Sequence, residues 1–317
     1  MYKLITHNDL DGLGCAILAK LAFGENISVE YASCHDNVTK ILNELIDNNL
    51  LNTFDSVFVT DCSFDIALAT KLKNKVKLFD HHKTADEFNQ FYWAKVSEQI
   101  DGCNTCGTEL WHNYLLKKGY LSFPRKFFVE QVRLYDTWDW SANPSNLPKY
   151  LNDVIYIHGI SSFVDTFVER LSKRDLNELT IFSQTERDLL DREQTRIRKY
   201  VNKKNKAAKI VEIDGKKIAV NFADDNQSSV GNAMCNTYDV DYVMMFSLDK
   251  SIVSLRSSDD GEDVATVAKA IGGGGHQHAA GSPIEETIIN NLITEVLHKV
   301  YQGNVTFHSD IENFLKK

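Results

Sequence analysis

The sequence predicts an α/β fold in two domains, an N-terminal parallel-sheet domain and a smaller C-terminal α/β domain, joined by a long helix. Three observations support this prediction. The first half alternates short β-branched runs with helix-like stretches, which is typical of βαβ units around a parallel sheet. A long charged stretch follows, and the last third returns to strand-like runs. A chain of 317 residues is also longer than one hydrophobic core comfortably supports.

The N-terminal elements follow from this alternation. Strands are expected at residues 2–5, 27–33, 55–60 and 76–79, and helices at residues 12–23, 38–47 and 67–73. From about residue 106 to 172 the pattern is mostly helical, interrupted by prolines. We therefore place the first domain at residues 1–172.

A connector helix is predicted at residues 173–206, because most of this stretch is highly charged and contains neither Gly nor Pro. It lacks the clean heptads of a coiled-coil dimer, and a homodimer is left open. The second domain, residues 207–317, begins with strands at 207–211 and 217–222 around Asp214-Gly215, a favourable hairpin turn. Further strands are expected at 242–247 and 252–257, and helices at 263–271 and 284–301.

Composition limits the compartment and the partners. The N-terminus runs directly into a strand, no apolar run could span a bilayer, and six cysteines are scattered without a framework. We therefore expect a cytoplasmic protein that does not bind membranes. Binding to long nucleic acids depends on neutralising many phosphates. The net charge of −9 therefore favours short substrates.

Four clusters of acidic and histidine residues suggest a metal site, and three of them follow predicted strands. They are residues 7–12 (His-Asn-Asp-Leu-Asp-Gly), Asp61, residues 80–82 (Asp-His-His) and Asp136. Ligands collect at the carboxyl ends of parallel strands, and carboxylate oxygens with imidazoles suit Mg²⁺ or Mn²⁺. Each motif alone has a structural alternative: a surface turn for residues 9–12, a helix N-cap for Asp61, and a buried structural carboxylate for Asp136.

A glycine–histidine segment at residues 272–281 suggests phosphate binding in the second domain. Consecutive glycines expose backbone N–H groups to phosphate oxygens, and His276 could donate a further hydrogen bond. Arg256, near the end of a predicted strand, is a second candidate phosphate ligand. An exposed strand arginine without a ligand explains its spacing equally well.

Taken in order, these motifs resemble the DHH phosphoesterases. The glycine–histidine segment resembles that of the nucleic-acid-processing branch, which includes long-strand exonucleases and oligoribonucleases. The resemblance covers about residues 1–301, and the N-terminal motif and compact length look most like the oligoribonucleases. One departure is Cys15, where many members have Ser, which affects local packing only.

The resemblance implies two divalent cations, with Mn²⁺ expected and Mg²⁺ as the alternative. One cation would be held by His7 and Asp9, the other by Asp11, His81 and Asp136, with Asp61 bridging them. Asp80 would support the ligands of the site without binding a cation itself, and His82 would face the scissile phosphate. The implied substrate-binding residues are Arg256, Gly273, Gly274, Gly275 and His276.

The implied activity is hydrolysis of short RNA or DNA oligonucleotides to 5′-mononucleotides. A cyclic-dinucleotide phosphodiesterase or a nucleoside 3′,5′-bisphosphate phosphatase is the nearest alternative. A long single-strand exonuclease fits the acidic charge less well. A non-catalytic nucleotide sensor is disfavoured by the complete set of ligands.

Overall fold

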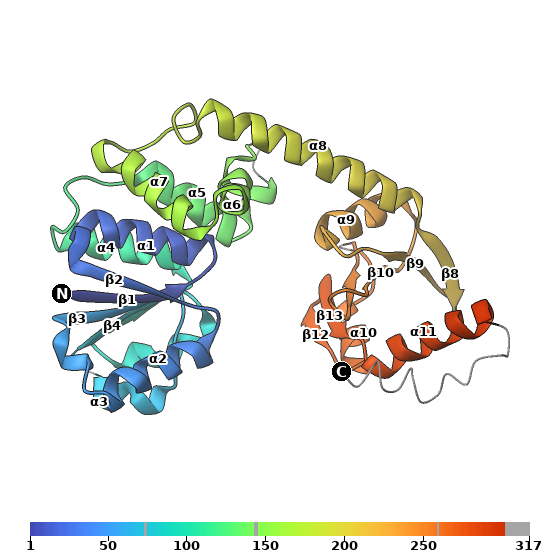
Figure 1. Ribbon diagram of the computed structural model, residues 1–317, viewed down its shortest axis with the longest axis horizontal. Coiled ribbons are helices and arrows are strands. Elements are labelled where there is room, and N and C mark those ends of the chain that lie inside the picture. The colour runs from blue at the N-terminus through green and yellow to red at the C-terminus, as the bar shows by residue number, and fades with distance from the viewer. Residues whose placement is uncertain (73–74, 143–144, 259, 302–317) are drawn as a thin grey trace. The chain divides into compact units, whose positions relative to one another are not determined.

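The structure, a computed structural model, describes residues 1–72, 75–142, 145–258 and 260–301. The chain divides into two compact units, residues 1–191 and 192–317 (Figure 1). The division falls inside helix α8 (Gln184–Lys206), within the predicted connector. The predicted domain limits stay predictions, and residues 302–317 of the predicted second domain lie outside the described residues.

A five-stranded parallel sheet of order β2-β1-β3-β4-β5 forms the centre of the first unit. Its strands are β1 (Tyr2–His7), β2 (Ile27–Ala32), β3 (Ser56–Thr60), β4 (Val76–Asp80) and β5 (Ala94–Val96). The predicted α/β fold and the first four strands are confirmed. Strand β5 was not predicted, because only three residues pair, which is too few for a pattern to be recognised.

Helices cover both faces of this sheet (Figure 1). Helices α1 (Leu10–Phe23) and α4 (Gly107–Lys117) lie on one face, and α2 (His35–Asp47) and the short α3 (Ala69–Leu72) lie on the other. Neighbouring strand residues serve opposite cores: Phe58 packs with the first layer, and Val57 and Val59 pack with the second. Strand β3 is consequently buried throughout, as expected for a sheet covered on both sides.

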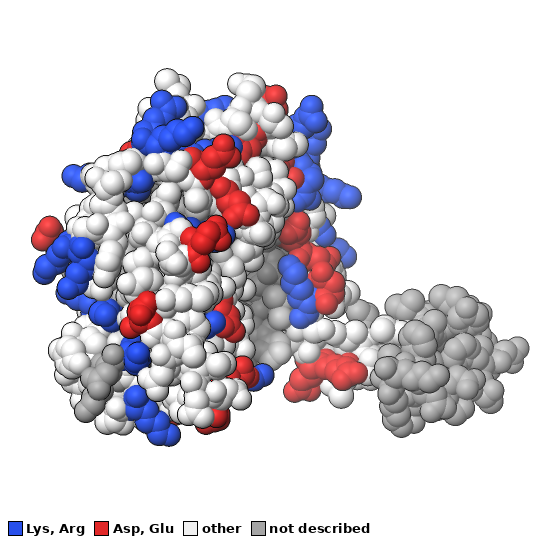
Figure 2. Space-filling view, turned by 60° about the vertical axis from the view of Figure 1, so that its left-hand side comes forward, with Lys and Arg blue, Asp and Glu red and all other residues white. Residues whose placement is uncertain are grey.

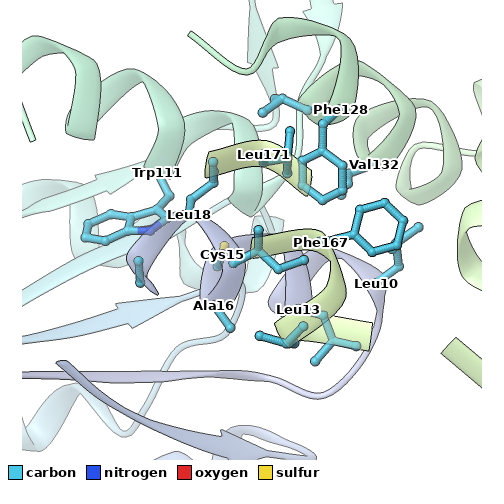
Figure 3. Close-up of a cluster of buried hydrophobic side chains, with 14 of the residues drawn as sticks. Leu10, Leu13, Cys15, Ala16, Leu18, Trp111, Phe128, Val132, Phe167 and Leu171 are labelled. Atoms are coloured by element: carbon cyan, nitrogen blue, oxygen red, sulfur yellow. The ribbon is translucent and has the colours of Figure 1, made fainter. Parts of the chain in front are cut away.

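A second helical layer lies over α1. It consists of α5 (Lys126–Asp136), α6 (Leu147–His158) and α7 (Ile160–Lys173). Leu10 and Leu13 of α1 share one apolar cluster with Phe128 and Phe167 of this layer (Figure 3). Helix α1 is therefore buried from Leu10 to Ala19, because it lies between the sheet and the outer helices.

The remaining elements of the first unit are short. A small hairpin joins β6 (Gln99–Ile100) to β7 (Cys103–Asn104). Five 3₁₀ segments complete its described part: Gly24–Asn26, Leu51–Thr53, Ile66–Leu68, Lys83–Gln90 and Asp139–Ala142. No helix in the described part of the chain is long and apolar enough to cross a lipid bilayer.

The second unit contains a six-stranded sheet of order β12-β13-β11-β10-β9-β8. Only the β9–β10 pair is parallel among its described strands. The strands are β8 (Lys209–Ile213), β9 (Lys216–Phe222), β10 (Tyr242–Ser247), β11 (Ile252–Arg256), β12 (Gly274–His276) and β13 (Ala279–Pro283). The helices are α9 (Gln227–Thr237), α10 (Val264–Ala270) and α11 (Glu286–Tyr301). The predicted turn is confirmed: Asp214 and Gly215 have φ values of 51° and 74°, as a tight hairpin requires.

Two parts of the second unit differ from the sequence prediction. The glycine–histidine segment, for which no strand was predicted, forms the hairpin β12–β13. Helix α9 was missed, because its residues are mostly small or polar and show no clear apolar stripe.

A buried carboxylate fixes the start of α8. Glu186 is only 3% exposed and accepts hydrogen bonds from Arg170 (2.8 Å) and from the backbone N–H of Ser183 (2.6 Å). His158 Nε2 lies 2.8 Å from the same carboxylate. Burial alone would raise the pKa of Glu186, but the hydrogen bonds from Arg170 and Ser183 outweigh it and leave the pKa below its usual value.

This arrangement predicts a pH-dependent contribution to stability. Glu186→Gln should lower the free energy of unfolding by about 3 kcal/mol at neutral pH, because it breaks a buried pair. The folded pKa lies below the unfolded one, so the contribution is complete above about pH 5 and is lost as the pH falls through the folded pKa. Urea unfolding of both proteins should therefore show a gap that closes in acid. A gap that stays constant down to the acid limit would contradict this role.

Candidate metal centre

Residues from all four predicted clusters come together at the carboxyl edge of the parallel sheet. His7 ends β1, Asp61 follows β3 directly, and Asp80 ends β4. Asp136 arrives from the last turn of α5. Three overlapping sets have ligand atoms within 4.8 Å of one another: His7, Asp9 and Asp61; Asp11, His81 and Asp136; and Asp61, His81 and His82.

Asp61 is shared by two of these sets. Its Oδ1 lies 3.3 Å from His81 Nε2, and its Oδ2 lies 4.0 Å from His7 Nδ1. The residue is 2% exposed and has a φ of 56°, an unusual conformation for a residue with a side chain that often marks functional sites. It is not a helix cap, because the next helical segment starts at Ile66 and is capped by Asp65.

Asp11 is held by the first turn of α4. Its two carboxylate oxygens accept hydrogen bonds from the backbone N–H groups of Gly107 (2.6 Å) and Thr108 (2.7 Å). The Thr108 hydroxyl donates to the Asp11 carbonyl oxygen at 2.6 Å. A Cβ at Gly107 would lie 2.8 Å from the Asp61 Cβ, so only glycine fits there without displacement. Gly107 and Thr108 were not predicted from the sequence, where their only signal was their place at the start of a mostly helical region.

His7 and Asp9 form a pair at the opposite side of the cluster. His7 Nδ1 lies 2.8 Å from Asp9 Oδ2, and His7 Nε2 lies 3.3 Å from the Ser33 carbonyl oxygen. The hydrogen bond to Asp9 raises the pKa of His7. Asp9 also caps α1, accepting from the Gly12 N–H at 3.0 Å. A Cβ at Gly12 would lie 2.0 Å from the His7 carbonyl oxygen, so this close turn requires glycine.

Asp80 orients the two histidines that follow it. Its Oδ1 accepts from the backbone N–H groups of His81 (2.8 Å) and His82 (3.2 Å) and lies 2.7 Å from His82 Nδ1. This hydrogen bond raises the pKa of His82, whose side chain is 52% exposed. His81 is more deeply placed, with its Nε2 3.4 Å from Asp136 Oδ2 and 3.8 Å from Asp11 Oδ2.

The chemistry of this cluster fits a divalent cation. Burial, followed by the charges of Asp11 and Asp9, raises the pKa of Asp136 to about 8 and that of Asp61 well above its usual value. Within the described residues, Asp61 Oδ2, Asp136 Oδ2 and His81 Nε2 are buried without a hydrogen-bond partner. Such atoms are costly unless something binds them. Carboxylate oxygens and imidazole nitrogens, without thiolates, suit Mn²⁺ or Mg²⁺.

The predicted phosphate-binding residues lie in the second unit. Arg256 is half-buried on β11, where its guanidinium donates to the Ser228 hydroxyl at 2.9 Å. It packs over α9, since a Cβ at Gly231 would lie 2.6 Å from Arg256 Cγ. It is therefore not the exposed strand arginine of the alternative interpretation.

The glycine–histidine segment is confined by close backbone packing. His276 is exposed on β12. A Cβ at Gly273 would lie 2.1 Å from the Gly281 carbonyl oxygen, and Gly275 has a φ of 143°. Gly274 has open space where a Cβ would lie. Two of the three predicted glycines are thus required by the backbone itself.

An aromatic group beside Asp136 was not predicted to be functional. The Trp138 and Trp140 rings meet edge to face at 5.2 Å, and Trp140 stacks on Tyr135 at 6.3 Å. Trp138 is 55% exposed and has a φ of 65°, which is rare for a bulky residue. Arg133 forms a 2.9 Å ion pair with Asp139, the residue between the two tryptophans, and so stabilises this segment. The sequence shows the aromatic residues but not which ring is exposed.

The chain is similar to a known domain family and to a known protein. The DHHA1 domain model matches residues 215–302. Oligoribonuclease NrnB of Bacillus subtilis (strain 168) is 33% identical over 305 residues, which is 93% of this chain and 76% of the relative.

Two solved structures share the fold. The pGpG-specific phosphodiesterase PggH from Vibrio cholerae has a TM-score of 0.55 and 12% identity, over 95% of this chain and 99% of that one. RecJ from Thermus thermophilus in complex with Mn²⁺ has a TM-score of 0.51 and 15% identity, over 95% of this chain and 52% of that one.

The crowded carboxylates predict that metal binding stabilises the fold. A cation at one hundred times its dissociation constant should add about 2.7 kcal/mol to the free energy of unfolding, so MnCl₂ should raise the melting temperature of metal-free protein. Asp61→Asn should remove most of this shift, while making the metal-free protein no less stable because repulsion is relieved. Thermal unfolding with and without Mn²⁺ measures both effects. An undiminished shift in the variant would mean that Asp61 does not bind the metal.

Proposed function

This chain belongs to the DHH phosphoesterase family, and on that premise we propose that it hydrolyses short oligonucleotides to 5′-mononucleotides. The observation that carries the proposal is the convergence of carboxylates and imidazoles from four distant segments on one sheet edge. The relative with 33% identity is an oligoribonuclease, and the match covers 93% of this chain. The proposed ligands are His7, Asp9, Asp11, Asp61, His81 and Asp136.

Two divalent cations held by these residues would supply an activated water and neutralise charge on the phosphate. We propose Mn²⁺ as the preferred cation. Mg²⁺ favours ligand sets made of oxygen atoms alone, whereas His7 and His81 add imidazole nitrogens to this set. Mg²⁺ is the alternative. Asp61 is the proposed bridge, since it is a member of the set with His7 and Asp9 and of the set with His81 and His82. His81 in turn belongs to the set with Asp11 and Asp136.

His82 is the proposed contact to the scissile phosphate. Asp80 holds its Nδ1 at 2.7 Å, which leaves Nε2 for the substrate. The same hydrogen bond raises the pKa of His82. A donor fixed in this way would stabilise the negative charge that develops on phosphate oxygens during hydrolysis. Asp80 thus acts through His82.

The second unit is proposed to hold the phosphates of the substrate. Strand β12 lies at the edge of its sheet, so part of its backbone has no neighbouring strand within the described residues and can bind phosphate oxygens. Gly273, Gly274 and Gly275 keep side chains away from this backbone. His276 and Arg256 would add charged or polar donors.

Short substrates fit the charge of the protein. The chain has 35 Lys and Arg against 44 Asp and Glu. On the face drawn in Figure 2, basic side chains are interspersed with acidic and uncharged ones. A long strand would gain little from such a surface, because its affinity comes from many phosphate contacts. The cytoplasm is the proposed location, since all six cysteines are free.

The proposal predicts a preference for short RNA. With Mn²⁺, initial rates should peak at roughly two to five nucleotides and depend weakly on salt, because few phosphates are contacted. The measurement is a length series of labelled RNAs up to about twenty nucleotides at two salt concentrations. Rates that rise to the longest RNA and collapse in high salt would instead indicate a long-strand exonuclease. Faster turnover of cyclic dinucleotides or 3′,5′-bisphosphates would indicate those activities.

His276→Ala should separate substrate binding from metal binding. We expect kcat/KM to fall by about tenfold or more because a phosphate contact is lost, with Mn²⁺ content unchanged by elemental analysis. Gln277→Ala, at the exposed neighbouring position, is the matched control and should behave as wild type. Loss of metal together with activity would move His276 into the metal centre.

We propose that the exposed Trp138 ring stacks on a base of the substrate, so Trp138→Ala should raise KM more than it lowers kcat. Stacking of a base on an aromatic ring contributes about 1–3 kcal/mol, so KM should rise by about tenfold, whereas Trp138→Phe should retain most of the affinity. Steady-state kinetics on a short RNA tests this expectation. Equal behaviour of the two variants would show that the exposed ring does not contact the substrate.

A further inference from the structure

A cavity lies at the β5 edge of the sheet in the first unit. It has a volume of about 690 Å³, and none of the proposed metal ligands lines it. Its walls come from β4, from edge strand β5 with the segment before it, from the β6 turn and from the second half of α4. This volume is in the range of pockets that bind small molecules.

Aromatic rings form much of its inner wall. Phe79 and Trp93 are buried, at 5% and 6% exposed. Tyr114 is half-buried and lies 4.7 Å from Phe79 between ring centroids. Tyr92 stands at the rim, 84% exposed. Such rings offer flat apolar surface to a heteroaromatic base.

Four lysines surround the same cavity: Lys77, Lys95, Lys117 and Lys118. Asp101 is the one carboxylate among the lining residues. Among the described residues, every lysine that forms an ion pair within 4.0 Å lies outside this cavity. None of the four cavity lysines therefore has a carboxylate partner at that distance in the described part of the chain. Burial, and then the charge of Lys118, lowers the pKa of Lys77. Such a group of cations is unexpected in a chain of net charge −9, and an anion would relieve their repulsion.

We infer that this basic–aromatic pocket binds a nucleotide, with the base against Phe79, Tyr92 and Tyr114 and the phosphates on Lys77, Lys117 and Lys118. Both chemical features are needed for this assignment. Lysines alone would indicate any anion, and rings alone would indicate any apolar group. Their combination in one cavity selects an aromatic ring that carries phosphate. The site is separate from the proposed metal centre and goes beyond the proposed hydrolysis.

The test is isothermal titration of the full chain with ADP and GDP in EDTA, which removes metal and stops turnover. Wild-type protein should bind a nucleoside diphosphate, and the double variant Lys117→Glu with Lys118→Glu should bind it at least about tenfold more weakly, because two attractive charges become repulsive. Lys40→Glu, at an exposed position of α2, is the matched control and should bind as wild type. Adenosine and inorganic phosphate, titrated separately, should each bind more weakly than ADP.

Absence of nucleotide binding by wild-type protein would overturn the inference. So would equal binding by the double variant, or binding that is lost in His276→Ala and kept in the double variant, which would place the nucleotide in the second unit. Inorganic phosphate that binds as tightly as ADP would show an anion site without base recognition and would also overturn it. If the double variant does not fold, Lys95→Glu and Tyr92→Ala replace it, each with the same expected loss.

Discussion

Mutual repulsion among buried carboxylates is the constraint on which the first unit depends. Asp11 and Asp61 are each at most 2% exposed, and Asp136 is the third carboxylate near His81. Crowding of this kind destabilises a fold unless protons or cations neutralise it. Backbone dipoles offset part of this repulsion, because two N–H groups in the first turn of α4 donate hydrogen bonds to Asp11. The remaining charge is what the two proposed divalent cations would neutralise.

The same constraint explains the glycines and the unusual backbone around the centre. Gly12 lets the start of α1 approach the His7 carbonyl oxygen, and Gly107 lets the start of α4 approach Asp61. Asp61 itself adopts a positive φ, and its two carboxylate oxygens lie near His81 and His7. Asp80 has a different task, because it holds His82 rather than joining a metal set. Asp61, which follows β3, thus belongs to two of the possible metal-binding sets, whereas Asp80, the last residue of β4, orients a neighbour.

Much of this was predictable from sequence, for a physical reason. Strands such as β3 are buried on both faces and therefore read as continuous apolar runs, and the polar residues that end them stand out. What was missed depends on packing in space. Gly107 and Thr108 serve Asp11 across a long sequence separation, which no local pattern reveals. Helix α9 lacks an apolar stripe, and strand β5 has too few residues to show the pattern of a strand. The exposed ring of Trp138 and the basic–aromatic pocket depend on which side chains neighbouring elements leave uncovered.

The central claim is that Asp61 joins two cation sites that carry out hydrolysis. The most direct measurement is the rate of cleavage of a short labelled RNA by Asp61→Ala at saturating Mn²⁺, beside Asp65→Ala as a nearby control that caps the next helical segment. We expect the first variant to lose activity by about a thousandfold or more, because a shared charged ligand is removed, and the second to keep it. Near-wild-type turnover by Asp61→Ala would contradict the account.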